Sequence, residues 1–155
     1  MPICNPSDLK RLLKPGERLL GLDVGTRTIG MALSDTTLLV ATPFDTIRRS
    51  RFRADAARLA AEIARHKVGG IVVGLPLSLD GDEGPRTQGV RQFARNLLEQ
   101  IDLPLAFWDE RLSTAAVERE MIDADLTRKR RAEIIDKVAA AYILQGLLDR
   151  IGRER

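Results

Sequence analysis

Three carboxylates in this 155-residue chain lie where an uncompensated charge is costly. Asp23 is near the end of an alternating apolar segment, Glu110 directly follows another apolar segment, and Asp136 lies within a helical pattern. If the three acids met at one site they would repel one another, and hard divalent cations such as Mg²⁺ or Mn²⁺ would relieve that repulsion. Two such ions about 4 Å apart can activate water and stabilise the leaving oxygen of a phosphodiester.

The surroundings of Asp23 favour a site with room for a cation. Strand alternation sends Asp23 and Gly21 to one face of residues 18–24, and Leu20, Leu22 and Val24 to the other. The predicted partner strand, residues 29–34, also carries small side chains on one face, so a hydrated ion could fit beside the carboxylate. The alternative is a structural role, in which the Asp23 side chain caps the turn that follows its strand.

Asp109 and Glu110 end the last predicted strand together. Successive side chains of a strand point to opposite faces, so only one of these acids can face Asp23. The other then pairs with Arg111 or caps the following turn. A purely structural role for both acids is the alternative, because acids are common where a helix begins.

Asp136 belongs to an otherwise apolar stripe of the last predicted helix. Its face also carries Ala139, Ala140, Ile143 and Leu147. A carboxylate on such a face needs a metal or a charged partner, and its position in the early turns adds some stabilisation from the helix dipole. The alternative to a metal is a structural ion pair with a nearby arginine.

The remaining pattern is typical of an α/β domain. Predicted strands cover residues 18–24, 29–34, 38–43, 71–75 and 105–108, and predicted helices cover 52–63, 85–101, 114–123 and 130–151, with Gly69-Gly70 ending the first helix. A meander followed by strand–helix–strand–helix gives a mixed five-stranded sheet flanked by helices. Residues 1–16 contain prolines and no periodicity, so we expect a flexible leader before one domain, residues 17–152.

The composition favours a soluble protein of the cytoplasm. Apolar residues make up 44% of the chain, and no apolar run approaches the roughly 20 residues needed to cross a bilayer. The N-terminus lacks the apolar segment of a secretory signal, and the single cysteine, Cys4, excludes an internal disulfide. We expect a monomer or homodimer with no membrane partner.

Clustered positive charge points to nucleic acid as the partner. The net charge is only +3, but two runs concentrate it, namely Arg48, Arg49, Arg51 and Arg53, and then Arg128, Lys129, Arg130 and Arg131. Dense like charge is self-repulsive unless a polyanion or solvent compensates it. Ordinary solvated charges are the alternative.

Four sequence blocks together resemble the signature of a known family. They are LLGLDVGTRTIGMALSD (19–35), IVVGLPLSLDG (71–81), FWDERLST (107–114) and IIDKVAAAYILQGLLD (134–149). In this order they resemble the YqgF family across roughly residues 18–151, and four ordered blocks are far more specific than any one motif. The resemblance implies a ribonuclease-H-like fold. Members were first proposed as Holliday-junction resolvases and are now widely regarded as nucleases that mature the 5′ end of pre-16S rRNA.

The resemblance also implies roles for individual residues. The metal-binding catalytic acids would be Asp23, Glu110 and Asp136, which would hold two Mg²⁺ or Mn²⁺ ions. Residues beside the scissile phosphate would be Gly25, Thr26 and Arg27. The Glu110 end of the site would be supported by Arg111, Ser113 and Thr114.

Other functions stay open at this point. RNA and branched DNA present the same phosphates, so a Holliday-junction resolvase is one alternative. An actin-like or sugar-kinase-like ATPase shares the Asp-x-Gly-Thr turn, but such proteins clamp ATP between two domains and need about 350 residues. A non-catalytic RNA-binding factor for ribosome assembly is the third alternative. The acid trio argues against it, because binding alone would favour removing negative charge near phosphate.

The arginine runs lead to a prediction about salt. If about four phosphate contacts form on a duplex, the logarithm of the binding constant should fall with the logarithm of salt concentration at a slope near −3.6. Reversing the charges of Arg128, Arg130 and Arg131 together should flatten that slope, measured by fluorescence anisotropy. An unchanged slope would identify these three as ordinary solvated charges.

Overall fold

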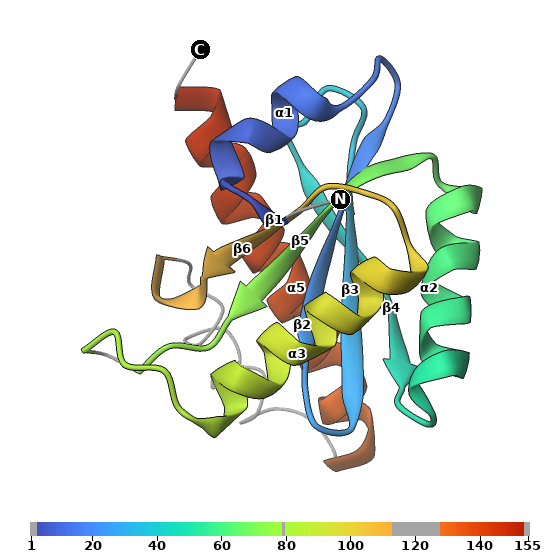
Figure 1. Cartoon of the computed structure of the whole chain (residues 1–155), viewed down its shortest axis with the longest axis vertical. Helices are drawn as coiled ribbons and strands as arrows, with labels where there is room; N and C mark the ends of the chain where they lie inside the picture. Colours follow the sequence, from blue (N-terminus) through green and yellow to red (C-terminus); the bar gives the residue numbers. More distant parts are fainter. Residues whose placement is uncertain (1–2, 79, 113–127, 154–155) are drawn as a thin grey trace.

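A six-stranded mixed sheet forms the centre of the computed structural model, which describes residues 3–78, 80–112 and 128–153 (Figure 1). Its strands are β1 (Ile3–Cys4), β2 (Arg18–Val24), β3 (Thr28–Ser34), β4 (Ala41–Arg48), β5 (Val68–Leu75) and β6 (Leu105–Asp109), in the order β1-β6-β5-β2-β3-β4. The β2–β3 and β3–β4 pairs are antiparallel, and the β1–β6, β6–β5 and β5–β2 pairs are parallel. The predicted mixed α/β fold is confirmed, with one strand more than the five expected.

Helices cover both faces of this sheet (Figure 1). The helical elements are η1 (Pro6–Asp8), α1 (Leu9–Leu12), α2 (Phe52–Arg65), α3 (Pro85–Gln100), η2 (Glu110–Leu112) and α5 (Arg128–Arg153). Leucines of β2 on one face pack with α2 and α3, whereas the opposite face packs against α5. Because α5 buries its alanine and leucine stripe here, the predicted apolar face of this helix is the one that meets the sheet.

Two glycines let α5 lie directly on the β2–β3 hairpin. A Cβ atom placed on Gly30 would come within 1.9 Å of the Asp136 carbonyl oxygen, and one on Gly21 within 2.8 Å of the Leu144 Cβ. Both distances are too short for any side chain, so the backbones approach closely only because neither residue has one. This contact fixes the height of Asp136 above β3.

The N-terminal segment differs from the expected flexible leader. Ile3–Cys4 pairs in parallel with β6, and the Leu9 side chain is fully buried in the cluster beneath α5. A two-residue strand carries no periodicity, so its pairing leaves no signal in the sequence. Part of residues 1–16 therefore extends the sheet and its core.

The third strand begins later than predicted. Instead of covering residues 38–43, it spans Ala41–Arg48, because the preceding residues form a turn. Leu38 has a φ of 60°, and the Asp35 carboxylate accepts hydrogen bonds from the backbone N–H groups of Leu39 and Val40. The apolar residues 38–40 were thus predicted to form a strand, although hydrogen bonds to the Asp35 carboxylate hold them in a turn.

The glycine pair expected to end the first helix belongs to a strand instead. Gly69 and Gly70 lie within β5, and α2 ends earlier, at Arg65. A Cβ atom on Gly70 would come within 2.8 Å of the Leu19 side chain, so close packing rather than helix termination explains this residue. No helix in the described part of the chain is long and apolar enough to cross a membrane.

The close contact at Gly30 predicts that replacing glycine by alanine changes the free energy of unfolding differently at Gly30 and at Gly89. Gly30→Ala should lower the free energy of unfolding by about 1–3 kcal/mol or more, because the new methyl group must push α5 from the sheet. Gly89→Ala is the matched control, since a Cβ atom there meets nothing within 4 Å and helix propensity favours alanine by up to about 1 kcal/mol. Urea unfolding measures both, and equal stability of the two variants would contradict the close contact.

Candidate active site

Asp23 is buried at the end of β2, with 1% of its surface exposed. Its register partner on β3 is Gly30, and continuing the β2–β5 register past Val73 places Gly74 beside it on the other side. The acid therefore has a glycine on each neighbouring strand, on the face that α5 covers. This arrangement agrees with the small neighbours predicted for Asp23, and the volume over the two glycines is filled by groups of α5 and by Glu110.

Asp136 stands over one of these glycines. Its backbone carbonyl lies against Gly30, the register partner of Asp23, and its Oδ2 accepts a hydrogen bond from the Thr28 hydroxyl. The half-buried Asp136 carboxylate is therefore oriented by the β3 strand on which its helix rests.

Glu110 lies against the other glycine, on the opposite side of Asp23. A Cβ atom on Gly74 would come within 2.9 Å of Glu110 Oε1, so the absent side chain makes room for this carboxylate. Across the sheet, the order is thus Glu110 beside β5, Asp23 on β2 and Asp136 over β3. All three acids lie near the carboxyl ends of the parallel strands β2 and β5, where α/β folds place their functional groups.

Asp109 turns away from this row, as strand alternation predicts. Its Oδ1 accepts hydrogen bonds from the Arg111 backbone N–H at 3.0 Å, and its Oδ2 lies 2.6 Å from the Arg111 guanidinium. The hydrogen bonds with Arg111 hold the pKa of Asp109 below its ordinary value. Asp109 and Arg111 thereby neutralise each other, and Arg111 supports the strand end through Asp109.

The donor chemistry of the row suits hard cations, because it consists only of carboxylate oxygens. Its side chains are not gathered around one point, however. Among the described residues, no group of three or more His, Cys, Asp or Glu side chains is arranged to hold a metal ion. The Glu110 carboxylate and the Asp136 backbone each lie against a glycine that flanks Asp23.

The turn after β2 is tied to the rest of the protein through Gly25. The Gly25 N–H donates to the Thr28 carbonyl at 2.8 Å, and its carbonyl accepts a hydrogen bond from the Arg49 guanidinium at 2.6 Å. Both backbone groups of Gly25 are thus engaged internally. Of the turn residues predicted to contact substrate, Thr26 and Arg27 have exposed side chains.

Some predicted residues lie outside the described part of the chain. They are Ser113, Thr114 and the predicted helix 114–123, and the same holds for the side chains of residues 128–133, which include the second arginine run. In the first run, Arg49 is half-buried and bonded to Gly25, while Arg51 and Arg53 are exposed. Sequence reasoning missed the structural role of Arg49, since nothing in the run distinguishes it from its neighbours.

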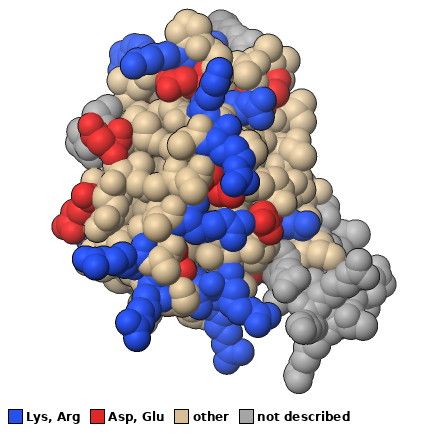
Figure 2. Space-filling model, turned by 90° about the vertical axis from the view of Figure 1, so that its right-hand side faces the viewer, with Lys and Arg blue, Asp and Glu red and all other residues tan. Residues whose placement is uncertain are grey.

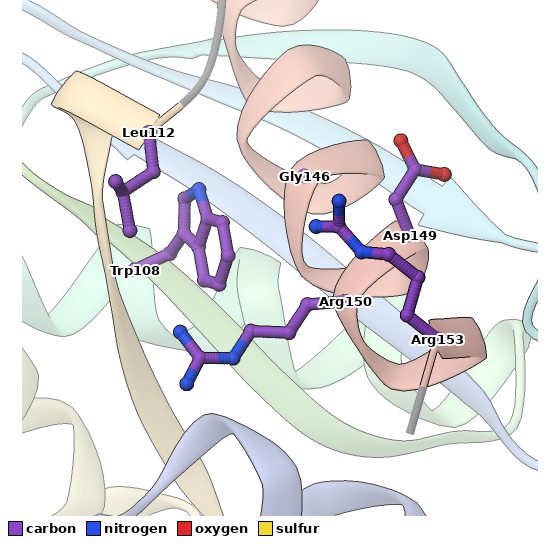
Figure 3. A pocket seen from close by; sticks show the side chains of 6 residues that line it. All are labelled: Trp108, Leu112, Gly146, Asp149, Arg150 and Arg153. Atoms are coloured by element: carbon purple, nitrogen blue, oxygen red, sulfur yellow. The ribbon is translucent and has the colours of Figure 1, made fainter. Parts of the chain in front are cut away.

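A separate cavity of about 560 Å³ flanks the Glu110 end (Figure 3). Trp108 and Leu112 reach it from the β6–η2 edge, and Asp149, Arg150 and Arg153 reach it from the last turns of α5. None of the predicted catalytic acids lines it. The carboxylate row is therefore the better candidate for the active site.

Comparison with known proteins identifies the family. A family model named RuvX and described as Holliday junction resolvase matches residues 17–150. The chain belongs to the RuvX family. This is the family that the four sequence blocks resemble under the name YqgF.

Relatives of this RuvX-family protein match along nearly its whole length. A protein of Paramagnetospirillum magneticum is 59% identical over 96% of both chains, and one of Rhodospirillum rubrum is 54% identical over 100% of this chain and 97% of its own. Both carry the provisional description pre-16S rRNA nuclease. Among solved structures, Thermus thermophilus RuvC in complex with a Holliday junction substrate aligns with a TM-score of 0.56 at 15% identity, covering 88% of this chain and 96% of RuvC. At this identity the likeness shows a shared fold and nothing further.

The Asp109–Arg111 pair at the end of β6 predicts a measurable shift in the pKa of Asp109. Because the pKa of Asp109 is lowered by folding, this group contributes stability above about pH 4, which is lost as pH falls through the depressed pKa. Arg111→Gln should raise the pKa of Asp109 toward its ordinary value, measured from carboxyl carbon chemical shifts by NMR. Asp35, whose pKa is lowered to about 2 chiefly by the Thr37 hydroxyl, is the internal reference and should not move. An unmoved Asp109 would contradict the assignment of its partner.

Proposed function

We propose that this protein is a divalent-metal-dependent endonuclease that hydrolyses nucleic-acid phosphodiesters and matures the 5′ end of pre-16S rRNA. The observation that carries the proposal is the carboxylate row Glu110–Asp23–Asp136 at the strand ends of a RuvX-family chain. A buried acid such as Asp23 is costly unless a cation compensates it. Such a function places the protein in the cytoplasm, where ribosomal precursors are processed.

In this proposal the three acids hold Mg²⁺ or Mn²⁺, most simply two ions. When bound, such ions lower the pKa of water and stabilise the charge that develops on the leaving oxygen. Asp23, which has no freedom to swing into solvent, provides the fixed central ligand. Asp136 and Glu110 approach it from α5 and from the end of β6, and the Thr28 hydroxyl limits the rotation of Asp136.

The remaining residues bind and orient the substrate. Thr26 and Arg27 present a hydroxyl and a guanidinium at the turn directly after the central acid. Arg111 keeps Asp109 out of the carboxylate row by neutralising it. The site thus presents one acid, not two, from the end of β6, which limits the negative charge that the phosphate must approach.

Two substrates are candidates within this proposal. The relatives' descriptions favour pre-16S rRNA, whereas the family model's description favours a Holliday junction. The phosphodiester chemistry is the same for both. A side-by-side cleavage assay with a pre-rRNA 5′ fragment and a four-way DNA junction therefore decides between them.

The catalytic assignment predicts a sharp contrast between neighbouring acids. Glu110→Gln and Asp136→Asn should each reduce metal-dependent cleavage at least about a hundredfold, because each removes a charged ligand. Asp109→Asn is the matched control at the same strand end and should retain most activity, since its charge is used by Arg111. Gel assays of cleavage in Mg²⁺ or Mn²⁺ measure the three variants.

Stability gives an independent check on the same variants. Removing one charge from a crowded acid row should relieve repulsion, so the melting temperature of Asp136→Asn without added metal should stay level or rise. Full activity in EDTA, or undiminished cleavage by Asp136→Asn, would exclude the metal-dependent mechanism. Nucleic-acid binding without cleavage under all conditions would favour a role in assembly alone.

A further inference from the structure

A small cationic cavity lies on the other side of the turn that follows Asp23. It has a volume of about 230 Å³ and is enclosed by the turn at Gly25 and Thr26, by Arg49 after β4, and by the first turns of α3. Val24 lines it, and strand alternation sends the side chains of Val24 and Asp23 to opposite faces of the sheet. The cavity and the carboxylate row are therefore separated by the end of a single strand.

Arg49 is held rigidly at this cavity. Its guanidinium donates to the Gly25 carbonyl at 2.6 Å, its backbone N–H donates to the Arg27 carbonyl at 2.8 Å, and its Cζ atom lies 5.2 Å from the centre of the Phe93 ring. A guanidinium offers five N–H donors, and only part of that capacity is used here. The fixed orientation lowers the entropic cost of binding a further acceptor.

Arg86 faces the same cavity from α3, and no carboxylate lines it. Within the residues that the structure describes, Arg86 makes no hydrogen bond or ion pair, and its side chain is exposed. Two guanidinium groups thus share a small space without a neutralising acid. The uncapped start of α3 at Gly84 adds a weaker attraction of the same sign.

We propose that this cavity binds a backbone phosphate of the substrate, the neighbour of the phosphate that lies at the carboxylate row. The inference rests on the proposed nuclease function and adds a phosphate site to it. A nucleic-acid strand that crosses the end of β2 over Thr26 has the acids on one side and the two arginines on the other. Arg49 and Arg86 are positioning residues in this arrangement and take no part in the chemistry.

The chemistry of the lining favours a phosphate over a base. Of the residues that the structure describes, no aromatic one lines the cavity, and the Phe93 ring beneath Arg49 is buried, so it offers no stacking face. Paired guanidinium groups match the oxygens of a phosphate, which accept several charge-assisted hydrogen bonds. Lys and Arg side chains also gather at the lower end of the face in Figure 2, the end at which Figure 1 shows the β2–β3 turn, and this positive charge would attract a polyanion.

A charge introduced at Gly89 tests the site without altering its arginines. Gly89 lines the cavity, and a Cβ atom there meets nothing within 4 Å, so Gly89→Glu and Gly89→Gln should both fold. The probe is a fluorescein-labelled pre-rRNA 5′ fragment, bound in EDTA and followed by anisotropy. The Glu variant should bind about tenfold more weakly than the Gln variant, because only the carboxylate competes with phosphate for the guanidinium groups.

Removing one arginine tests the same site from the opposite direction. Arg86→Gln should reduce the salt slope of binding by about one phosphate contact, raise KM and leave kcat nearly unchanged. Arg95→Gln is the control, because Arg95 lies on the same helix, bonded to Gln92 and outside the cavity. It should bind as the wild type does.

The outcomes separate this inference from the proposed function. If the wild type cleaves RNA but the Glu and Gln variants at position 89 bind equally, the phosphate site is wrong and the nuclease stands. If binding responds to the charge at position 89 while no substrate is cut, the site stands and the nuclease proposal fails. A methylphosphonate scan of the cleaved fragment gives the final check. Neutralising the phosphate next to the cut should weaken the wild type more than Arg86→Gln, in which only Arg49 still contacts that phosphate, and equal weakening of both proteins would overturn the assignment.

Discussion

The contact between the α5 backbone and Gly30 is the constraint on which the rest of the site depends. Because Gly30 has no side chain, the carbonyl of Asp136 can rest on β3 beside the strand that carries Asp23. Any larger residue would lift the helix and carry its carboxylate away from the sheet. Gly21 makes the same kind of close contact with Leu144. The middle of α5 therefore rests on two glycines of the sheet, which have no side chains to hold it away.

The same device is used on the other side of the central acid. Gly74 leaves the space into which Glu110 reaches, while Ile143 of α5 packs against that glycine from above. The Asp136 backbone and the Glu110 carboxylate thus approach the two sides of Asp23 because glycines there have no side chains. If the three carboxylates converge, their mutual repulsion works against this arrangement, and the burial of hydrophobic side chains by α5 offsets it. In that case the packing of α5 on the sheet stabilises the fold, while the acids that it brings together destabilise it.

The sequence predicts those features that follow from one periodicity. Alternation along β2 placed Asp23 among small residues, and alternation at the end of β6 separated Asp109 from Glu110. Features that depend on a single side-chain acceptor or on distant pairing could not be predicted. The Asp35 carboxylate holds the turn after which β4 begins, so the strand starts later than its apolar pattern suggests. The pairing of Ile3–Cys4 depends on β6, which lies far along the chain at Leu105 and Ala106. For the same reason the role of Arg49 was invisible, since its acceptor is a backbone carbonyl.

In the proposed function, the separation of acids and arginines across the end of β2 lets one turn border both a metal site and a phosphate site. A metal site requires carboxylates, whereas a phosphate backbone requires cations, and the two would neutralise each other if they shared one surface. Alternation separates them, because Asp23 faces α5 and Val24 faces α3. Arg49 stays on its own side because it donates to the carbonyl of Gly25, a neutral group, instead of to a carboxylate of the row. The peptide backbone of the turn thus holds a cation close to the acids while leaving their charge available.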